Sequence, residues 1–371
     1  MKVVFFGTPE YVLPVLDTLH KKLKGGNGES PIVAVVTQPP RPTGRNQFLE
    51  YSAVDTWAHK KHIPKFHSSQ ELFKENIVAD IGVLASYGEI IPESIIKLFQ
   101  HGILNIHPSL LPTFRGASPI QAAIISGDTT TGVSIIKMDA ALDHGSIISQ
   151  FKEEISDEDN SEILRIRLFN RAAEVITTLI PAYLAGKITP REQDHDKAIF
   201  TRQIKKEDAF IPAKILNSAL TGVTPVNGKW KIPFIKDYSL VPSAYRQSRP
   251  SFAYSLDRFI RAMQPWPISW TYVQLGQRAK NSPSRRLFSE PGGSQNRRSR
   301  AVGKEHKRLK ILKSHLASIS DNSRKIRDVS EKSPDNTQEI TKLILDVVQL
   351  EGKGGVSWKQ FLEGYPEAKF I

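Results

Sequence analysis

Cysteine is absent from the 371 residues of the chain. Its absence excludes disulfide bonds, a thiolate nucleophile and zinc or iron–sulfur sites that are held by cysteine. No apolar run approaches the roughly 18 residues that a helix needs to cross a bilayer, so we expect no membrane partner. The phrase G-x-G-x-x-G is also missing, which argues against a dinucleotide site, and no histidine spacing indicates a bound metal.

Charge is distributed unevenly along the chain. Residues 1–200 hold 20 Lys and Arg against 23 Asp and Glu, a net charge of −3, whereas residues 201–371 hold 31 against 15, a net charge of +16. The content of 39% hydrophobic and 24% charged residues is typical of a globular protein, and the length favours two domains. A nearly neutral half followed by a basic half indicates an active domain joined to one that meets a polyanion.

The first half alternates short apolar runs with segments of helical spacing. Val3–Phe6, Ile32–Thr37 and Ile81–Ala85 are rich in β-branched residues, as buried parallel strands are. Strands that alternate with helices predict an α/β fold with a doubly wound, mostly parallel, Rossmann-like sheet. Thr131–Met138 and Ser146–Phe151 predict a strand pair around a candidate functional loop at 139–145.

The second half predicts a different architecture. Residues 1–190 form the expected α/β domain, residues 191–212 the link, and residues 213–371 a second domain. Its strand-like runs, separated by long turns, predict a small OB-like β-barrel: Trp270–Gln274, Leu309–Leu312 and Leu343–Leu350. Residues 280–304 are basic and rich in Ser, Asn and Gly, which predicts a disordered insertion. An electrostatic guide for a polyanion is an equally open interpretation of this segment.

Three polar residues form the candidate catalytic group. Asn105 and His107 follow the apolar run at 102–104, so they can project to one side at the carboxyl end of a strand. Asp143 lies in the predicted loop. A neutral donor, a donor that changes charge near neutral pH and a carboxylate that orients it suit a reaction through an oxyanion. Taken alone, the Asn-x-His phrase is more typical of a structural turn than of a catalytic site.

The surrounding sequence resembles a known family. Asn105–Ile120 reads NIHPSLLPTFRGASPI, and Leu142–Gly145 reads LDHG. The two phrases resemble the N-x-H-x-S-L-L-P-x-x-x-G motif and the L-D-x-G loop of the folate-dependent formyltransferase family. Further segments are similar to the methionyl-tRNA formyltransferase branch of that family: Phe6–Glu10, Thr37–Arg45, Ala85–Gly88, Ile260–Trp270 and Val347–Trp358.

The resemblance implies site residues, position by position. Asn105, His107 and Asp143 match the catalytic trio, and Arg45 matches the arginine of a loop that contacts tRNA. The positions that match the folate-binding wall are Tyr87, Gly88, Ser109, Leu110, Leu111 and Pro112. The chain departs from the family at Pro40, where an acid is usual, and at 46–50, where bacterial members carry lysines.

The resemblance also implies a function. Residues 1–190 would be the formyltransferase catalytic domain, which moves the formyl group of 10-formyltetrahydrofolate to the α-amino group of methionyl-initiator tRNA for translation initiation. The alternatives are glycinamide ribonucleotide transformylase, formyltetrahydrofolate hydrolase, or a catalytically silent RNA-binding protein on this fold. The two alternative enzymes would not need the basic second half, and a silent RNA-binding protein would not need the intact trio.

Location and assembly follow only by inference. No secretory signal or import presequence is visible before the run at 3–6. Initiator-tRNA formylation implies bacteria or organelles, and the departures near Arg45 favour a diverged mitochondrial matrix enzyme over one of the bacterial cytoplasm. We expect a monomer.

Overall fold

A computed structural model describes residues 1–26, 28–43, 46–223, 230–236, 239–240, 252–276, 306–320, 326–328 and 339–371. These residues form two compact units. The first comprises Met1–Ala123 and Asp128–Arg202, and the second comprises Ile124–Gly127 and Gln203–Ile371. The division after Arg202 lies within the stretch that the sequence assigns to the link. The predicted insertion at 280–304 and the tRNA-loop candidate Arg45 lie outside the described residues.

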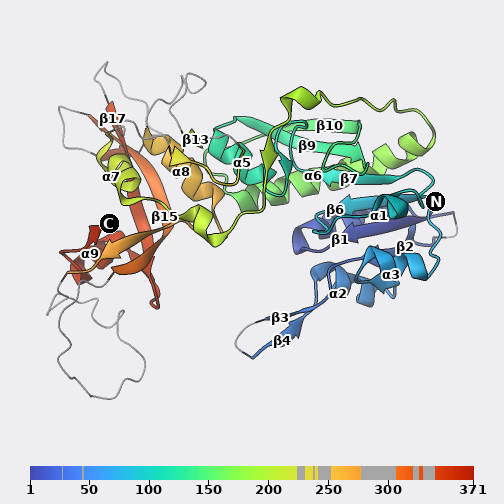
Figure 1. Ribbon diagram of the computed structural model, residues 1–371, viewed down its shortest axis with the longest axis horizontal. Helices are drawn as coiled ribbons and strands as arrows, with labels where there is room; N and C mark the ends of the chain where they lie inside the picture. Colours follow the sequence, from blue (N-terminus) through green and yellow to red (C-terminus); the bar gives the residue numbers. More distant parts are fainter. Residues whose placement is uncertain are drawn as a thin grey trace. The chain divides into compact units, whose positions relative to one another are not determined.

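The first unit is built on a seven-stranded sheet with the strand order β10-β9-β7-β6-β1-β2-β5 (Figure 1). Adjacent strands pair in parallel from β7 through β6, β1 and β2 to β5. Strand β9 pairs in antiparallel fashion with both of its neighbours, β7 and β10. The predicted doubly wound, mostly parallel sheet is therefore confirmed. The strands are β1 (Val3–Gly7), β2 (Ile32–Val36), β5 (Lys65–Phe66), β6 (Ile81–Ala85), β7 (Ile103–His107), β9 (Thr130–Lys137) and β10 (Ile147–Glu154).

Helices cover the sheet on both sides. They are α1 (Leu13–Lys22), α2 (Ala53–Lys60), α3 (Ser69–Lys74), α4 (Glu93–Ile96), α5 (Pro119–Ser126) and α6 (Ser161–Leu184). Pro14 stands in the first turn of α1, where it interrupts no helical hydrogen bond. The side chain of Asn160 caps α6 by accepting from the backbone N–H groups of Glu162 and Ile163.

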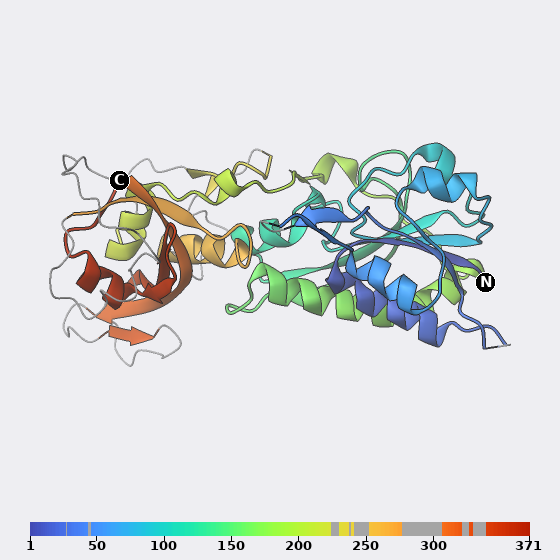
Figure 2. The same cartoon turned by 90° about the horizontal axis from the view of Figure 1, so that it is seen from below.

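The core of the first unit lies against the two faces of the sheet. Val4 and Phe6 of β1 pack with Ile95 and Phe99 from the α4 region, and the Phe6 ring meets the edge of Phe99 with 6.0 Å between centroids. Helices α1 and α6 pack against each other along the other face (Figure 2). Strand alternation explains the division, because neighbouring side chains of β1 point to opposite faces.

Short paired segments complete the first unit. Two of them form a hairpin of β3 (Arg41–Thr43) and β4 (Phe48–Glu50), which the sequence patterns do not predict. β8 (Arg115–Gly116) pairs in parallel with β11 (Phe200–Thr201), and Arg191 exchanges two backbone hydrogen bonds with Ile147. The segment from 191 to 201 is thus built into the first unit.

The second unit holds an antiparallel sheet with the order β18-β17-β15-β14-β19, and β16 pairs with β15. This sheet is consistent with the predicted small barrel. Its elements are α7 (Ala213–Thr221), β12 (Trp230–Lys231), β13 (Ser239–Leu240), α8 (Phe252–Ala262), β14 (Trp270–Gln274), β15 (His306–Ser320), β16 (Ile326–Asp328), β17 (Glu339–Leu350), β18 (Gly355–Ser357), α9 (Trp358–Gly364) and β19 (Lys369–Phe370). No helix within the described ranges is long and apolar enough to span a bilayer.

Candidate active site

Strand β7 carries two of the predicted catalytic side chains. The strand runs through to His107 and so extends beyond the apolar run at 102–104, because it pairs with β6 on one side and β9 on the other. Asn105 and His107 are two residues apart, so their side chains lie on the same face of the sheet. Both residues are buried.

Asp143 lies in the loop that joins β9 to β10, as the sequence predicts. Its φ of +48° is in the left-handed region, which aspartate tolerates better than most residues. Gly145 follows at a point where a Cβ atom would lie 1.8 Å from the carbonyl oxygen of Lys137, so no larger residue fits there. The loop is therefore held in an unusual conformation by its surroundings.

The three predicted residues come together. The Asn105 amide Nδ2 donates to Asp143 Oδ1 at 3.1 Å, and His107 Nδ1 lies 3.5 Å from the same oxygen. The other carboxylate oxygen, Oδ2, accepts from the backbone N–H of Gly116 at 2.8 Å. Only 6% of the His107 side chain and 10% of the Asp143 side chain are exposed. Charges in so dry a site interact more strongly than they do in water.

The imidazole of His107 has a defined tautomer. Its Nε2 lies 3.0 Å from the carbonyl oxygen of Phe114, which can only accept, so Nε2 carries a proton. The neutral ring then presents the lone pair of Nδ1 toward Asp143. Protonation at Nδ1 creates a cation beside the carboxylate, and that N–H becomes the donor available to a substrate.

The predicted folate-wall segment after β7 forms a closely bonded turn. The Ser109 hydroxyl donates to the Thr113 carbonyl at 2.6 Å, and the Ser134 hydroxyl donates to the Ser109 carbonyl at 2.7 Å. Ser134 Oγ also accepts from the backbone N–H of Leu111, whose side chain is buried. Leu110 and Pro112 are partly exposed. Contact of Ser109, Leu110, Leu111 and Pro112 with folate stays a prediction.

In the second predicted folate-wall segment, Tyr87 and Gly88, mainly backbone groups are available to a ligand. Tyr87 is 1% exposed and packs in the core, where burial raises the pKa of its hydroxyl. This hydroxyl donates a hydrogen bond to Glu89 Oε2 at 3.1 Å. The Tyr87 carbonyl accepts from the Thr8 hydroxyl. Gly88 has a φ of +89°, and a Cβ atom there would lie 2.5 Å from Gln38 Nε2. A ligand could therefore meet peptide groups of this loop but not the Tyr87 ring.

Sequence reasoning missed the residues that surround Asp143. Arg115 and Gln193 are both buried and hydrogen-bonded to each other. Gln193 also contacts the Asp143 loop, although it lies 50 residues further along the chain. Neither residue belongs to an apolar or helical pattern that would have indicated its burial. Only Arg115 could have been suspected of a role in the site, because it lies inside the N-x-H phrase.

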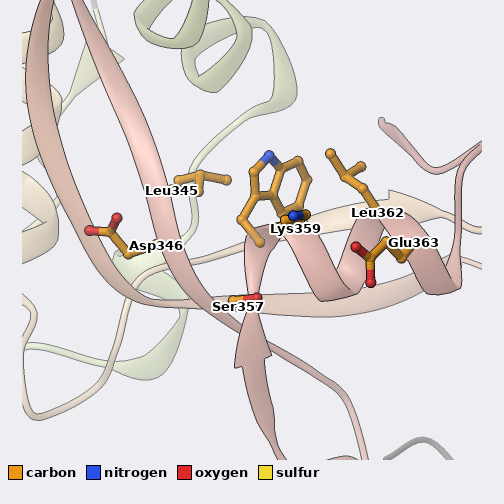
Figure 3. Close-up of a pocket in the computed structure, with 7 residues that line it drawn as sticks. Leu345, Asp346, Ser357, Lys359, Leu362 and Glu363 are labelled. Atoms are coloured by element: carbon orange, nitrogen blue, oxygen red, sulfur yellow. The ribbon is translucent and has the colours of Figure 1, made fainter. Parts of the chain in front are cut away.

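A shallow groove of about 610 Å³ lies in the second unit (Figure 3). It is lined by Leu345, Asp346, Ser357, Trp358, Lys359, Leu362 and Glu363. The groove is not part of the trio's site, because the trio belongs to the first unit. In the parts of the chain that the structure describes, no group of three or more His, Cys, Asp and Glu side chains is placed to hold a metal ion.

Known proteins are similar to this chain in sequence and in fold. Residues 1–180 match the Formyl transferase domain family, which defines the class of the first unit. A methionyl-tRNA formyltransferase of Listeria monocytogenes is 36% identical over 266 residues, which span 67% of this chain and 81% of that protein. The corresponding enzyme of Buchnera aphidicola is 33% identical over 281 residues, which span 74% and 76% of the two chains. The chain belongs to the methionyl-tRNA formyltransferase family.

Solved structures show the same fold. An N-formyltransferase from Helicobacter canadensis, in complex with folinic acid and dTDP-3-aminofucose, has a TM-score of 0.52 and 14% sequence identity. The match covers 93% of this chain and the whole of that one. At this identity the likeness concerns the fold alone.

Proposed function

We propose that this protein transfers the formyl group of 10-formyltetrahydrofolate to the α-amino group of methionyl-initiator tRNA. The observation that carries the proposal is the convergence of Asn105 and His107 on one oxygen of Asp143, in a chain of the methionyl-tRNA formyltransferase family. The arrangement supplies two N–H donors and one carboxylate, which acyl transfer to an amine requires.

The proposed reaction exchanges one carbon–nitrogen bond for another. The substrate amine attacks the formyl carbon, the carbonyl oxygen becomes an oxyanion, and the bond to N10 of the folate then breaks. The second N–H of Asn105 and the protonated Nδ1 of His107 donate to the oxyanion. A donor of this kind typically contributes about 3 kcal/mol to the stability of the transition state.

Asp143 is proposed to stabilise a protonated group, the His107 imidazolium, during the reaction. The amine must lose a proton and N10 must gain one, so the overall transfer consumes none. The carboxylate lies beside His107 Nδ1 and stabilises the imidazolium that donates to the oxyanion. Because Gly116 holds the other carboxylate oxygen, Oδ1 keeps its place between Asn105 and His107.

The second unit is proposed to meet the tRNA. The net charge of +16 over residues 201–371 attracts a polyanion, and β15 carries four of these cations at Lys307, Arg308, Lys310 and Lys313. Phosphate contacts of this kind position an RNA without reading its sequence. Arg45 is proposed as a further contact, on the ground of its place in the sequence motif.

We also propose a mitochondrial matrix location and a monomeric state. The departures at Pro40 and at 46–50 from the bacterial pattern motivate the location. Fractionation of cells that express a tagged copy tests it, and recovery in a bacterial or cytosolic fraction would overturn it. Sedimentation of the purified chain at micromolar concentration tests the monomer, which a stable dimer would refute.

A substrate panel tests the proposed function. Purified protein is given 10-formyltetrahydrofolate with methionyl-initiator tRNA, elongator methionyl-tRNA, free methionine, glycinamide ribonucleotide or water alone. We expect rapid transfer to the initiator tRNA. Preferred transfer to glycinamide ribonucleotide, or hydrolysis without an acceptor, would favour the other enzymes of this fold. Tight tRNA binding without any transfer would indicate a silent RNA-binding protein.

A further inference from the structure

Gln193 holds both ends of the turn that carries Asp143. Its amide Nε2 donates to the carbonyl oxygen of Asp143 at 2.9 Å and to that of Gly145 at 2.8 Å. Gln193 is 6% exposed, so water competes little for these bonds. Both amide protons are used, and the turn between 143 and 145 is fixed by a side chain from a distant segment.

Arg115 completes the network from the other side of Gln193. The Gln193 amide oxygen accepts from Arg115 Nε at 3.2 Å and from Arg115 Nη2 at 2.7 Å. Arg115 Nη2 also donates to His195 Nδ1 at 2.7 Å. Arg115 is 3% exposed, and burial lowers the pKa of its guanidinium although nearby Asp143 and Asp139 act in the opposite direction. Gln193 and His195 therefore supply the acceptors that a buried guanidinium needs.

The backbone beside Arg115 fixes the Asp143 carboxylate. Gly116 donates its N–H to Asp143 Oδ2, and its position is set by the pairing of β8 with β11. Thr201 donates its hydroxyl to the Arg115 carbonyl at 3.0 Å and accepts from the Ser118 N–H at 3.1 Å. A Cβ atom on Gly116 would lie 2.0 Å from the Thr201 carbonyl oxygen, so the two strands are in close contact.

We propose that Gln193 and Arg115 are positioning residues for the formyl transfer: they hold Asp143 in its left-handed conformation, so that its carboxylate stays between Asn105 and His107. The inference rests on the proposed function and adds two residues to it. Neither residue needs to touch a substrate. A displacement of about 1 Å in a catalytic group can reduce turnover by about 100-fold, so a clamp on the Asp143 turn has a large effect.

Two substitutions of Gln193 separate the two sides of the network. Gln193→Glu keeps an acceptor for Arg115 but has no proton to donate to the carbonyls of the Asp143 turn. Gln193→Met has a side chain of similar length but can form neither kind of hydrogen bond. Two neutral hydrogen bonds are worth about 1 kcal/mol each, so we expect kcat to fall by roughly 30-fold in Gln193→Glu. The loss should be larger in Gln193→Met, which also removes the oxygen that accepts from Arg115. Near-wild-type kcat in Gln193→Glu would overturn the inference.

A double-mutant cycle distinguishes positioning from general support of the fold. In an Asp143→Asn background, Gln193→Met should lower kcat by less than about twofold, because its effect acts through the Asp143 carboxylate. If the double variant lowers kcat by the product of the two single-variant effects, Gln193 acts independently of Asp143, and the proposal is refuted. Gln349→Met is the matched control, because Gln349 donates to a carbonyl, that of Lys353, in the second unit. It should leave kcat unchanged.

Hydrogen exchange gives a readout that does not depend on activity. Peptides that cover residues 139–146 should exchange faster in Gln193→Met than in the wild type, and Gln349→Met should not change them. Unchanged exchange in this loop would overturn the inference even if turnover fell. If the wild-type protein transfers no formyl group at all, the proposed function fails, whereas the exchange result still shows whether the clamp exists.

Discussion

Replacing Asp143 with asparagine is the sharpest test of the trio, because it removes one charge and little volume. Oδ2 accepts from the Gly116 N–H, and Oδ1 accepts from Asn105 and faces His107 Nδ1. An asparagine must place its NH₂ group at one of these two positions. In either orientation a donor meets a donor, so the carboxamide cannot reproduce the native bonds.

The magnitude follows from the distances. A carboxylate 3.5 Å from a protonated imidazole contributes about 4–5 kcal/mol at an effective dielectric constant of about 20. Part of this attraction is offset by the desolvation of the two charges, so we expect a loss of about 3–4 kcal/mol, or roughly 100- to 1,000-fold in turnover. The loss should appear in kcat, because the imidazolium is needed at the oxyanion stage.

The assay is single-turnover formylation of methionyl-tRNA with enzyme in excess. Asp139→Asn is the matched control, because Asp139 lies in the same loop but is 42% exposed and pairs with His144 instead of the trio. We expect the control to stay within about twofold of the wild type, since exposed pairs contribute little. An Asp143→Asn variant within tenfold of the wild-type rate would refute the role that we assign to the carboxylate.

Three further predictions follow from the structure. Asn105→Ala and His107→Ala should each lower turnover by about 100-fold while folate binding persists, and His107→Ala/Asp143→Asn should be little worse than the worse single variant; a retained rate or fully multiplied losses would contradict the trio. Burial would raise the pKa of Asp55, but hydrogen bonds from Lys65 and His67 outweigh it and hold that pKa below its ordinary value. Asp55→Asn should therefore lower the free energy of unfolding by about 2 kcal/mol at pH 7. The difference in unfolding free energy between wild type and variant should shrink as pH falls below about 3.9, because the carboxylate becomes protonated. If urea titrations show the same difference at pH 2, the charge of Asp55 is not its cause. A fragment ending near residue 210 should fold and bind a formylfolate analogue but show a much higher KM for methionyl-tRNA, and an unchanged KM would remove the second half from tRNA binding.

The pairing of Asn105 with His107 was predictable because its signal is local, whereas Asp143 was indicated only by the resemblance of its loop to the L-D-x-G phrase. Asn105 and His107 are two residues apart at the end of an apolar run, and strand geometry alone puts them on one face. The strands β1, β2 and β6 were equally visible, since fully buried parallel strands are continuous apolar runs.

Other features could not be predicted from local pattern. Strands β15 and β17 are longer than their apolar runs, because they alternate buried side chains such as Leu309 and Ile311 with exposed ones such as Lys313. Gln193 reaches the Asp143 loop only through the path of the chain between them, and its segment reads as a polar link. A buried glutamine in such a segment leaves no periodic trace in the sequence.

The most direct test of the account compares wild-type protein and His107→Ala in rapid-quench experiments. Formyl transfer from radiolabelled 10-formyltetrahydrofolate to methionyl-initiator tRNA is measured under single-turnover conditions, with equal folate occupancy checked for both proteins. We predict rapid transfer by the wild type and a rate at least about 100-fold lower for the variant. Absence of transfer by the folded wild type, or equal rates for the two proteins, would contradict the central claim that this trio formylates methionyl-tRNA.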